Sequence, residues 1–269
     1  MRTSFFAPMR SATMLVIALA VVESGAMDRN GVVLAFSFEK TEGEVVRDES
    51  PAGNDGTLID NAAIVNQGKF GRALMLDGGG DQVIVPKTDS LMIRGPMTVM
   101  AWVNFLDPIG RQTIIQKLEH FGNRGAGGWM LSMANGGNSI EWSISTDPKR
   151  MRNIFAVPVG GVGKNIWYQI AATWDEDTQR VYWDGDMVGD TPSLGNVQTP
   201  SGDPVKIGAR DQAQGDFFVN GRIDEVLIAA RVLTEDEMAE HRNMSLTQAL
   251  SVDPAGKLAA VWASLKERR

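Results

Sequence analysis

The sequence predicts an all-β fold, a two-sheet antiparallel sandwich. Short runs rich in β-branched and aromatic residues alternate with glycine, aspartate and proline, and the 29 glycines suit a chain with many turns. Residues 167–175 (WYQIAATWD) and 180–188 (RVYWDGDMV) are two alternating runs, and Asp184-Gly185 within the second accepts the positive φ angles of a type I′ turn. These two observations predict a β-hairpin inside a larger antiparallel structure.

The other strands are predicted from shorter apolar or alternating runs. Residues 31–39 (GVVLAFSFE) are expected to form a first strand inside a sheet, followed by a polar turn region at residues 47–57. Pro86 is expected to end a strand at residues 82–86, because proline has no N–H for a β-ladder. Further strands are expected at residues 73–76, 98–103, 112–116, 128–133, 139–145, 153–157, 205–211 and 217–228.

One short helix is expected after the last strand. Thr234 and Glu237 have the spacing of a capping box, in which each side chain bonds the other's free backbone N–H. Residues 257–268 also carry apolar side chains at helical spacing. This pattern predicts a helical tail that packs against the domain or, as the alternative, docks on a partner or a membrane surface.

Several of these blocks resemble a known family. In order and spacing, the runs LMLDGGGDQVIVP at 74–86, MTVMAWV at 97–103, VKIGARD at 205–211 and the IDEV segment before the capped helix are similar to the laminin-G-like jelly roll of the concanavalin A-like lectin and glucanase superfamily. The resemblance implies a jelly roll in which the first and last strands are neighbours. Such folds support many unrelated functions, so the resemblance does not determine an activity.

The N-terminal segment has the features of a secretory signal. Arg2 and Arg10 precede the apolar run 12–22, and Ser24-Gly25-Ala26 supplies a small-x-small cleavage site. The run is shorter than the ~20 apolar residues of a transmembrane helix, so an uncleaved anchor is the less favoured alternative. We therefore expect a signal peptide at 1–26, a jelly-roll domain at 27–245 and a tail at 246–269, in a secreted, periplasmic or cell-surface protein.

Composition narrows the classes of partner. A hydrophobic fraction of 43% and a charged fraction of 22% are ordinary for a globular domain. The formal net charge of −7 disfavours nucleic acid. The chain has no cysteine, although a signal peptide points to an oxidising compartment where disulfides persist. A bound metal ion would supplement the stability of a domain without disulfides.

A structural calcium site is the sharpest chemical prediction. Calcium prefers six to eight oxygen ligands from carboxylates, amides and carbonyls. The resemblance implies Asp48 and Asn54, in the loop after the first strand, and Asp224, in the IDEV segment, as ligands of one structural calcium. Alternatively, Asp48 and Asn54 form Asx-turns and Asp224 caps backbone N–H groups.

Catalytic patterns are weak. Only two histidines exist, His120 and His241, which excludes a histidine-rich zinc site, and His241 is expected on the surface of the capped helix. Glycosidases of the superfamily carry paired carboxylates as E-x-D-x-E on one strand. Here Glu141 is followed at that spacing by Ser143 and Ser145, so we expect no enzyme activity.

Aromatic and basic residues are the best candidates for ligand binding. Trp142 and Trp183 are predicted as platforms for a sugar ring, with core packing as the alternative for both. Arg150 and Arg152, in the basic segment 148–153, are predicted to hold an anionic glycan, the alternative being a solvated loop. The family resemblance implies that three other tryptophans fill the space between the sheets: Trp102, Trp129 and Trp167.

Together these observations predict an exported, non-catalytic binding module that recognises carbohydrate or another extracellular ligand and carries a structural calcium. Two alternatives remain. One is a structural or adhesive domain that binds another protein, suggested by the apolar tail. The other is a diverged glycoside hydrolase acting through Glu141.

Overall fold

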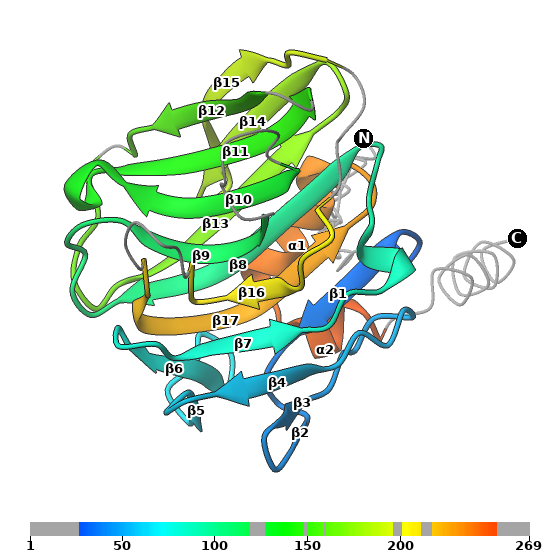
Figure 1. The fold of residues 1–269 in the computed structure, drawn as a ribbon. Helices are drawn as coiled ribbons and strands as arrows, with labels where there is room; N and C mark the ends of the chain where they lie inside the picture. Colours follow the sequence, from blue (N-terminus) through cyan, green and yellow to red (C-terminus); the bar gives the residue numbers. More distant parts are fainter. Residues whose placement is uncertain are drawn as a thin grey trace, which may run out of the picture.

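The protein is an antiparallel β-sandwich with two short helices on its outside (Figure 1). The computed structural model describes residues 27–118, 127–147, 150–158, 160–195, 201–210 and 217–251, and only the backbone of Asp147 and Arg150. The two sheets lie face to face and enclose the main hydrophobic core. The predicted all-β sandwich is therefore confirmed.

The first sheet has eight strands. It contains, in spatial order, β15 (Asp186–Pro192), β14 (Thr178–Trp183), β13 (Trp167–Trp174), β8 (Met97–Phe105), β17 (Asn220–Ala229), β6 (Ala73–Asp77) and β5 (Ala63–Val65), with β1 (Val32–Phe36) also paired to β17. All pairs are antiparallel.

The second sheet has nine strands. It contains, in spatial order, β12 (Arg150–Ala156), β11 (Ser139–Asp147), β10 (Gly128–Ala134), β9 (Gln112–Leu118), β16 (Val205–Ile207), β7 (Gln82–Val85), β4 (Gly56–Ile59), β3 (Val45–Val46) and β2 (Thr41–Glu42). Short 3-10 turns occur at Asp89–Leu91 and Asn135–Gly137. Strands β2 to β5 were not predicted, because each has only two to four residues and their segment is rich in turn-forming residues.

The first and last strands pair directly. In the ladder between β1 and β17, Leu34 lies opposite Ile228 and Phe36 opposite Val226. All five residues of β1 are buried, as expected for a strand inside a sheet. The predicted neighbourhood of the chain's opening and closing strands is therefore confirmed.

The predicted hairpin forms with the expected turn. Asp184 and Gly185 connect β14 to β15 with φ angles of 50° and 91°, the left-handed region that a type I′ turn requires at both positions. Gly185 also has no room for a side chain, because a Cβ there would lie 1.4 Å from Nη1 of Arg242. The turn sequence thus fixes both the hairpin and its contact with Arg242, which lies in the helix at residues 235–243.

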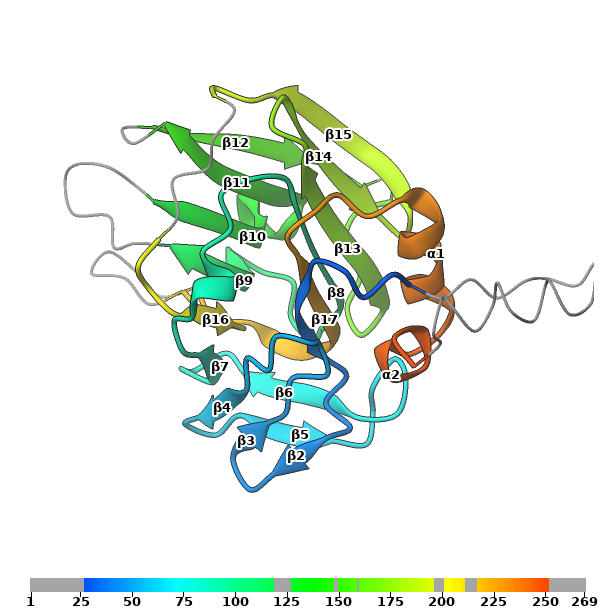
Figure 2. The same cartoon turned by 90° about the vertical axis from the view of Figure 1, so that its right-hand side faces the viewer.

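The two helices cover the outer face of the eight-stranded sheet (Figure 2). Helix α1 (Glu235–Asn243) begins with the predicted capping box of Thr234 and Glu237. Helix α2 (Leu246–Ala249) follows at once, and its buried side chains join a second apolar cluster outside the sandwich, which also contains Met27 and Met100. Packing against the sheet continues through Leu250, five residues beyond the boundary expected at 245.

The tryptophans divide between the two faces of the sheets. Trp129 and Trp174 are buried in the main core, as is Trp142. Trp102 is buried on the opposite side of its strand, where Nε1 donates to the carbonyl of His241 in α1 at 3.2 Å, and Trp167 is half-buried. The placement of Trp102 and Trp167 between the sheets was therefore wrong. Smaller residues such as Val99 and Ala101 take the inward positions of β8, and Ile170 and Ala172 take inward positions of β13.

Three predicted features lie outside the described residues: the signal segment 1–26, His120 and the helical pattern at 257–268. Within the described ranges, neither helix has the length and apolar character needed to cross a bilayer.

Candidate functional site

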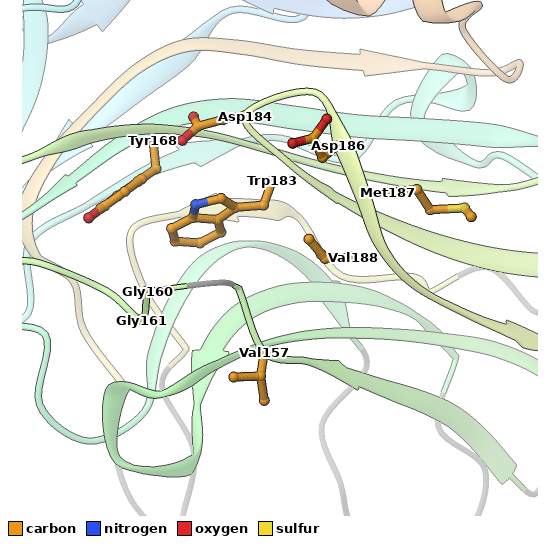
Figure 3. A pocket seen from close by; sticks show the side chains of 9 residues that line it. All are labelled: Val157, Gly160, Gly161, Tyr168, Trp183, Asp184, Asp186, Met187 and Val188. Atoms are coloured by element: carbon orange, nitrogen blue, oxygen red, sulfur yellow. The ribbon is translucent and has the colours of Figure 1, made fainter.

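A pocket opens at the edge of the sandwich beside the 184–185 hairpin turn (Figure 3). Its volume is about 560 Å³. It lies between the start of β13, the β14–β15 hairpin and the segment that follows β12. Its lining consists of Val157, Gly160, Gly161, Tyr168, Trp183, Asp184, Asp186, Met187 and Val188. We call it the Tyr168–Trp183 pocket.

Two aromatic rings form its centre. The ring centroids of Tyr168 and Trp183 are 4.4 Å apart, with an angle of 39° between the planes. The Tyr168 hydroxyl oxygen accepts a hydrogen bond from the N–H of Gly163 at 2.9 Å, which fixes the phenol ring. Trp183 is 7% exposed, so most of the indole packs in the core while the exposed part lines the pocket. A ligand would therefore meet a rigid aromatic surface.

Two carboxylates stand above the rings (Figure 3). Oδ1 of Asp184 accepts a hydrogen bond from the N–H of Gln169 at 2.8 Å, which holds the side chain beside the start of β13. Partial burial raises the pKa of Asp184, against the opposing effects of that hydrogen bond and of the cations Lys69 and Arg242. Asp186 is exposed. The pocket thus combines an aromatic surface with hydrogen-bond acceptors.

The rim of the pocket is apolar and open to solvent. Val157 is 67% exposed and Met187 56% exposed, although both are apolar residues. They come from the two opposite edges of the rim, one after β12 and one in β15. Exposed apolar side chains that gather around a cavity are typical of ligand or protein contact sites.

The structure separates the two predicted tryptophan platforms. Trp183 lines the pocket, whereas Trp142 is 0% exposed and packs against Trp129 with centroids 6.2 Å apart. Trp142 therefore presents no open ring face. It packs in the core, which was the alternative to a sugar platform. Ile140 and Ile144 alternate with Trp142 on the same buried face of β11, which is why the indole points inward.

The predicted basic site contributes little to the pocket. Nη2 of Arg152 donates to the hydroxyl of Thr191 at 3.0 Å and so links β12 to β15 across the two sheets. Arg152 does not line the pocket. The side chain of Arg150 lies outside what the structure describes.

Asp48 and Asn54 come together, but as a turn. The Asp48 carboxylate accepts hydrogen bonds from the N–H groups of Ala35 (2.8 Å), Ser50 (2.9 Å) and Asn54 (2.6 Å), and from the Ser50 hydroxyl (2.7 Å). Oδ1 of Asn54 accepts a hydrogen bond from the hydroxyl of Thr88 at 2.7 Å. The four acceptor positions of the Asp48 carboxylate are thus all used by donors, which is the Asx-turn alternative.

Asp224 bonds a different segment. Its Oδ2 accepts hydrogen bonds from the N–H groups of Lys69 (2.8 Å) and Phe70 (3.1 Å), so it caps backbone donors as in the alternative reading. Burial is the main cause that raises its pKa to about 7. In the described part of the chain, no three acidic, histidine or cysteine side chains are arranged to hold a metal ion. These oxygen atoms do not fit a calcium site in this arrangement, and the calcium stays an untested prediction.

His241 differs from its expected surface position. It is completely buried between α1 and the first sheet. Its Nε2 donates to the carbonyl of Glu225 at 2.6 Å, and its Nδ1 accepts from Nε2 of Gln169 at 2.8 Å. Burial lowers the pKa of His241 to about 4, although the bond to Glu225 opposes the shift. The prediction was wrong because a polar helix sequence does not reveal which side faces the sheet.

Glu141 is held as a structural carboxylate on the outer face of the nine-stranded sheet. It is 1% exposed and forms an ion pair with Arg111 at 2.8 Å. Its Oε1 accepts hydrogen bonds from Asn153 at 3.0 Å and from the Ser143 hydroxyl at 3.1 Å. Ser143 stands on the same face, at the position where the E-x-D-x-E pattern has its second carboxylate, so the strand lacks that pattern.

A family model described as the Concanavalin A-like lectin/glucanases superfamily, of laminin-G type, matches residues 77–239. The chain belongs to this superfamily. The match includes the hairpin, both aromatic residues of the pocket and most of α1, and it confirms the resemblance inferred from the sequence. A search of curated proteins found no match.

Solved structures share the fold at low identity. The binding domain of Paraclostridial Mosquitocidal Protein 1 is 17% identical with a TM-score of 0.59, over 80% of this chain and 52% of the other. The receptor binding domain of botulinum neurotoxin D is 14% identical with a TM-score of 0.60, over 80% and 53%. The binding domain of botulinum neurotoxin DC, solved in complex with rat synaptotagmin II, is 14% identical with a TM-score of 0.59, over 80% and 52%. The chain therefore spans about half the length of these structures.

Sequence reasoning found Trp183 but missed its neighbours in the pocket. Asp184 was interpreted only as a turn residue, and Tyr168 only as one position of an alternating strand. Asp186 and Met187 gave no signal of their own. The approach of Gly160 and Gly161 to the hairpin depends on the packing of two edge strands, which no local pattern reveals.

Proposed function

We propose that this chain is an exported, non-catalytic binding module whose ligand site is the Tyr168–Trp183 pocket. The observation that carries the proposal is the pocket itself, in which a fixed aromatic pair meets two carboxylates inside an open cavity of about 560 Å³. Concave sites with an aromatic lining and a few polar groups are the usual form of ligand sites.

Export and the absence of catalysis have separate support. The signal-like residues 1–26 support export, and the solved structures with the same fold are described as binding domains, one of them in complex with a protein. Ser143 and Ser145 follow Glu141 at the positions where the E-x-D-x-E pattern has its other carboxylates, which supports a non-catalytic role.

Two classes of ligand are compatible with the pocket. A carbohydrate would stack the apolar face of a sugar ring on the aromatic pair and donate hydroxyl hydrogen bonds to Asp184 and Asp186. A protein ligand is the second candidate, and the exposed apolar side chains of Val157 and Met187 favour it.

Binding arrays with a tryptophan variant test the proposal. The protein would be applied at high concentration to glycan and peptide arrays as wild type, Trp183→Ala and Trp167→Ala. Trp167 is the matched control, because it is a half-buried tryptophan on the opposite face of β13 from Tyr168. We expect at least one ligand that Trp183→Ala loses and Trp167→Ala keeps. Blank arrays, or equal loss in both variants, would contradict the proposal.

A further inference from the structure

The lining of the Tyr168–Trp183 pocket carries charge of one sign only. Two of its nine residues are aspartates and none is basic. Asp186 is exposed, and its side chain makes no hydrogen bond or ion pair with any residue that the structure describes. Asp184 accepts one backbone hydrogen bond, and its nearest cations approach from outside the pocket, with Arg242 bonded to the carbonyl of the turn at 2.8 Å. The pocket therefore carries negative charge without an internal counter-ion.

Negative charge beside aromatic rings favours a cationic ligand. The faces of tryptophan and tyrosine attract cations, and a neighbouring carboxylate adds a charge-assisted hydrogen bond. Burial is the main cause that raises the pKa of Asp184, and a cation bound beside the carboxylate would favour its charged form. A neutral sugar would stack on the rings and donate hydrogen bonds to the two carboxylates, but it would not neutralise their charge.

We infer that the pocket receives the cationic side chain of a lysine or arginine from a partner polypeptide, with the cation between the aromatic pair and the two aspartates. The inference rests on the proposed function, because it names the ligand class of the same pocket.

The rim explains why the cation would belong to a polypeptide. Val157, Ile166 and Met187 are 67%, 50% and 56% exposed. Val157 and Met187 line the pocket, and Ile166 lies beside it, since a Cβ added to Gly163 would meet both Ile166 and the Tyr168 hydroxyl. A free alkyl cation would leave these apolar side chains uncovered. A peptide with apolar residues next to its basic residue would cover them.

Paired peptides test the inference. The tripeptide acetyl-Leu-Arg-Leu-amide, the same peptide with uncharged citrulline in place of arginine, and butylguanidine would each be titrated into the ¹⁵N-labelled full chain. The readout is the indole N–H resonance of Trp183, assigned by its loss in Trp183→Phe. We expect the arginine peptide to shift this resonance and to bind about tenfold more tightly than the citrulline peptide. Butylguanidine should bind more weakly than the arginine peptide.

Charge-neutral variants keep the test specific. Asp184→Asn retains both the turn preference and the oxygen that accepts from Gln169, so the Asp184→Asn/Asp186→Asn double variant should fold. It should bind the arginine peptide about tenfold more weakly. Asp190→Asn removes one negative charge from β15 outside the pocket and should bind like the wild type.

The outcomes separate this inference from the proposed function. Equal affinity for the arginine and citrulline peptides would contradict the inference that the ligand is cationic. Equal affinity for butylguanidine and the arginine peptide would contradict the inference that the cation belongs to a polypeptide. If an array ligand shifts the Trp183 resonance while the two peptides behave alike, the pocket stands as a binding site and only the cation inference fails. If no ligand shifts it, both fail.

Discussion

The side chain of Glu225 accepts a hydrogen bond from the backbone N–H of Leu246, the first residue of α2. Glu225 lies at the bulge of β17 with a φ of 51° and is completely buried. Its other oxygen, Oε1, has no hydrogen-bond partner among the described residues. Burial, and next the neighbouring Asp224, raise the pKa of Glu225 to about 9. A buried carboxyl group thus holds α2 on the sheet.

This placement predicts a stability that falls as pH rises. Folded Glu225 keeps its proton to about pH 9, whereas the unfolded chain loses it near the ordinary value of 4.5. The folded state therefore binds more protons between these values, and the free energy of unfolding decreases with rising pH. Glu225→Gln cannot ionise, so we expect it to be more stable than the wild type at pH 9, on the order of a few kcal/mol.

Urea denaturation at pH 5, 7 and 9 measures this difference. Glu235→Gln, an exposed glutamate in the first turn of α1, should keep the wild-type dependence. A wild-type stability that rises steadily from pH 5 to pH 9 would contradict the assignment.

His241 is predicted to affect stability with the opposite sign, in a pH range that overlaps the lower part of the Glu225 range. Its pKa of about 4 in the folded state lies below the ordinary value of 6.5, so the unfolded chain binds more protons between these values. The contribution of His241 to stability should therefore fall as pH decreases from about 6.5 to about 4, and over this interval it opposes the contribution of Glu225. His241→Leu would leave the Glu225 carbonyl without this donor, and we expect a loss of about 2 to 4 kcal/mol at pH 7. Chemical denaturation measures the loss, and a variant as stable as the wild type would show that the two hydrogen bonds contribute nothing.

Calcium binding can be decided by thermal unfolding. Because donors already use the oxygens of Asp48 and Asp224, we expect the melting temperature to be the same in calcium and in chelator. A native-state ion at a hundred times its Kd would instead add about 2.7 kcal/mol. A rise with calcium that Asp224→Asn abolishes would restore the predicted calcium site.

Ligand affinity should depend on pH through Asp184. Its raised pKa means that Asp184 takes up a proton at higher pH than an ordinary aspartate does. A cationic ligand should therefore bind more weakly on acidification, and the loss should begin above the ordinary value of 3.8. Titrations of the arginine peptide between pH 7 and 4 measure this, and Asp184→Asn should show a smaller change. Affinity that increases toward acid would contradict the role of the carboxylate.

Features set by neighbours in the chain were predicted well. The Asp184-Gly185 turn and the Thr234–Glu237 capping box each depend on residues within one turn, so the local sequence is enough. The burial of Trp142 also had a local signal, since Ile140 and Ile144 alternate with it. Features set by distant segments were missed. The burial of His241 against the sheet and the position of Gly160 in the lining of the same pocket as the hairpin both depend on how segments distant in the sequence pack.

The central claim is that ligand binds at the Tyr168–Trp183 pocket and not on the outer face of the nine-stranded sheet. The most direct measurement is the dissociation constant of the tightest array ligand for the wild type, Trp183→Ala and Glu141→Gln. We expect Trp183→Ala to weaken binding at least about tenfold and Glu141→Gln to leave it unchanged. Weaker binding by Glu141→Gln together with unchanged binding by Trp183→Ala would contradict the claim.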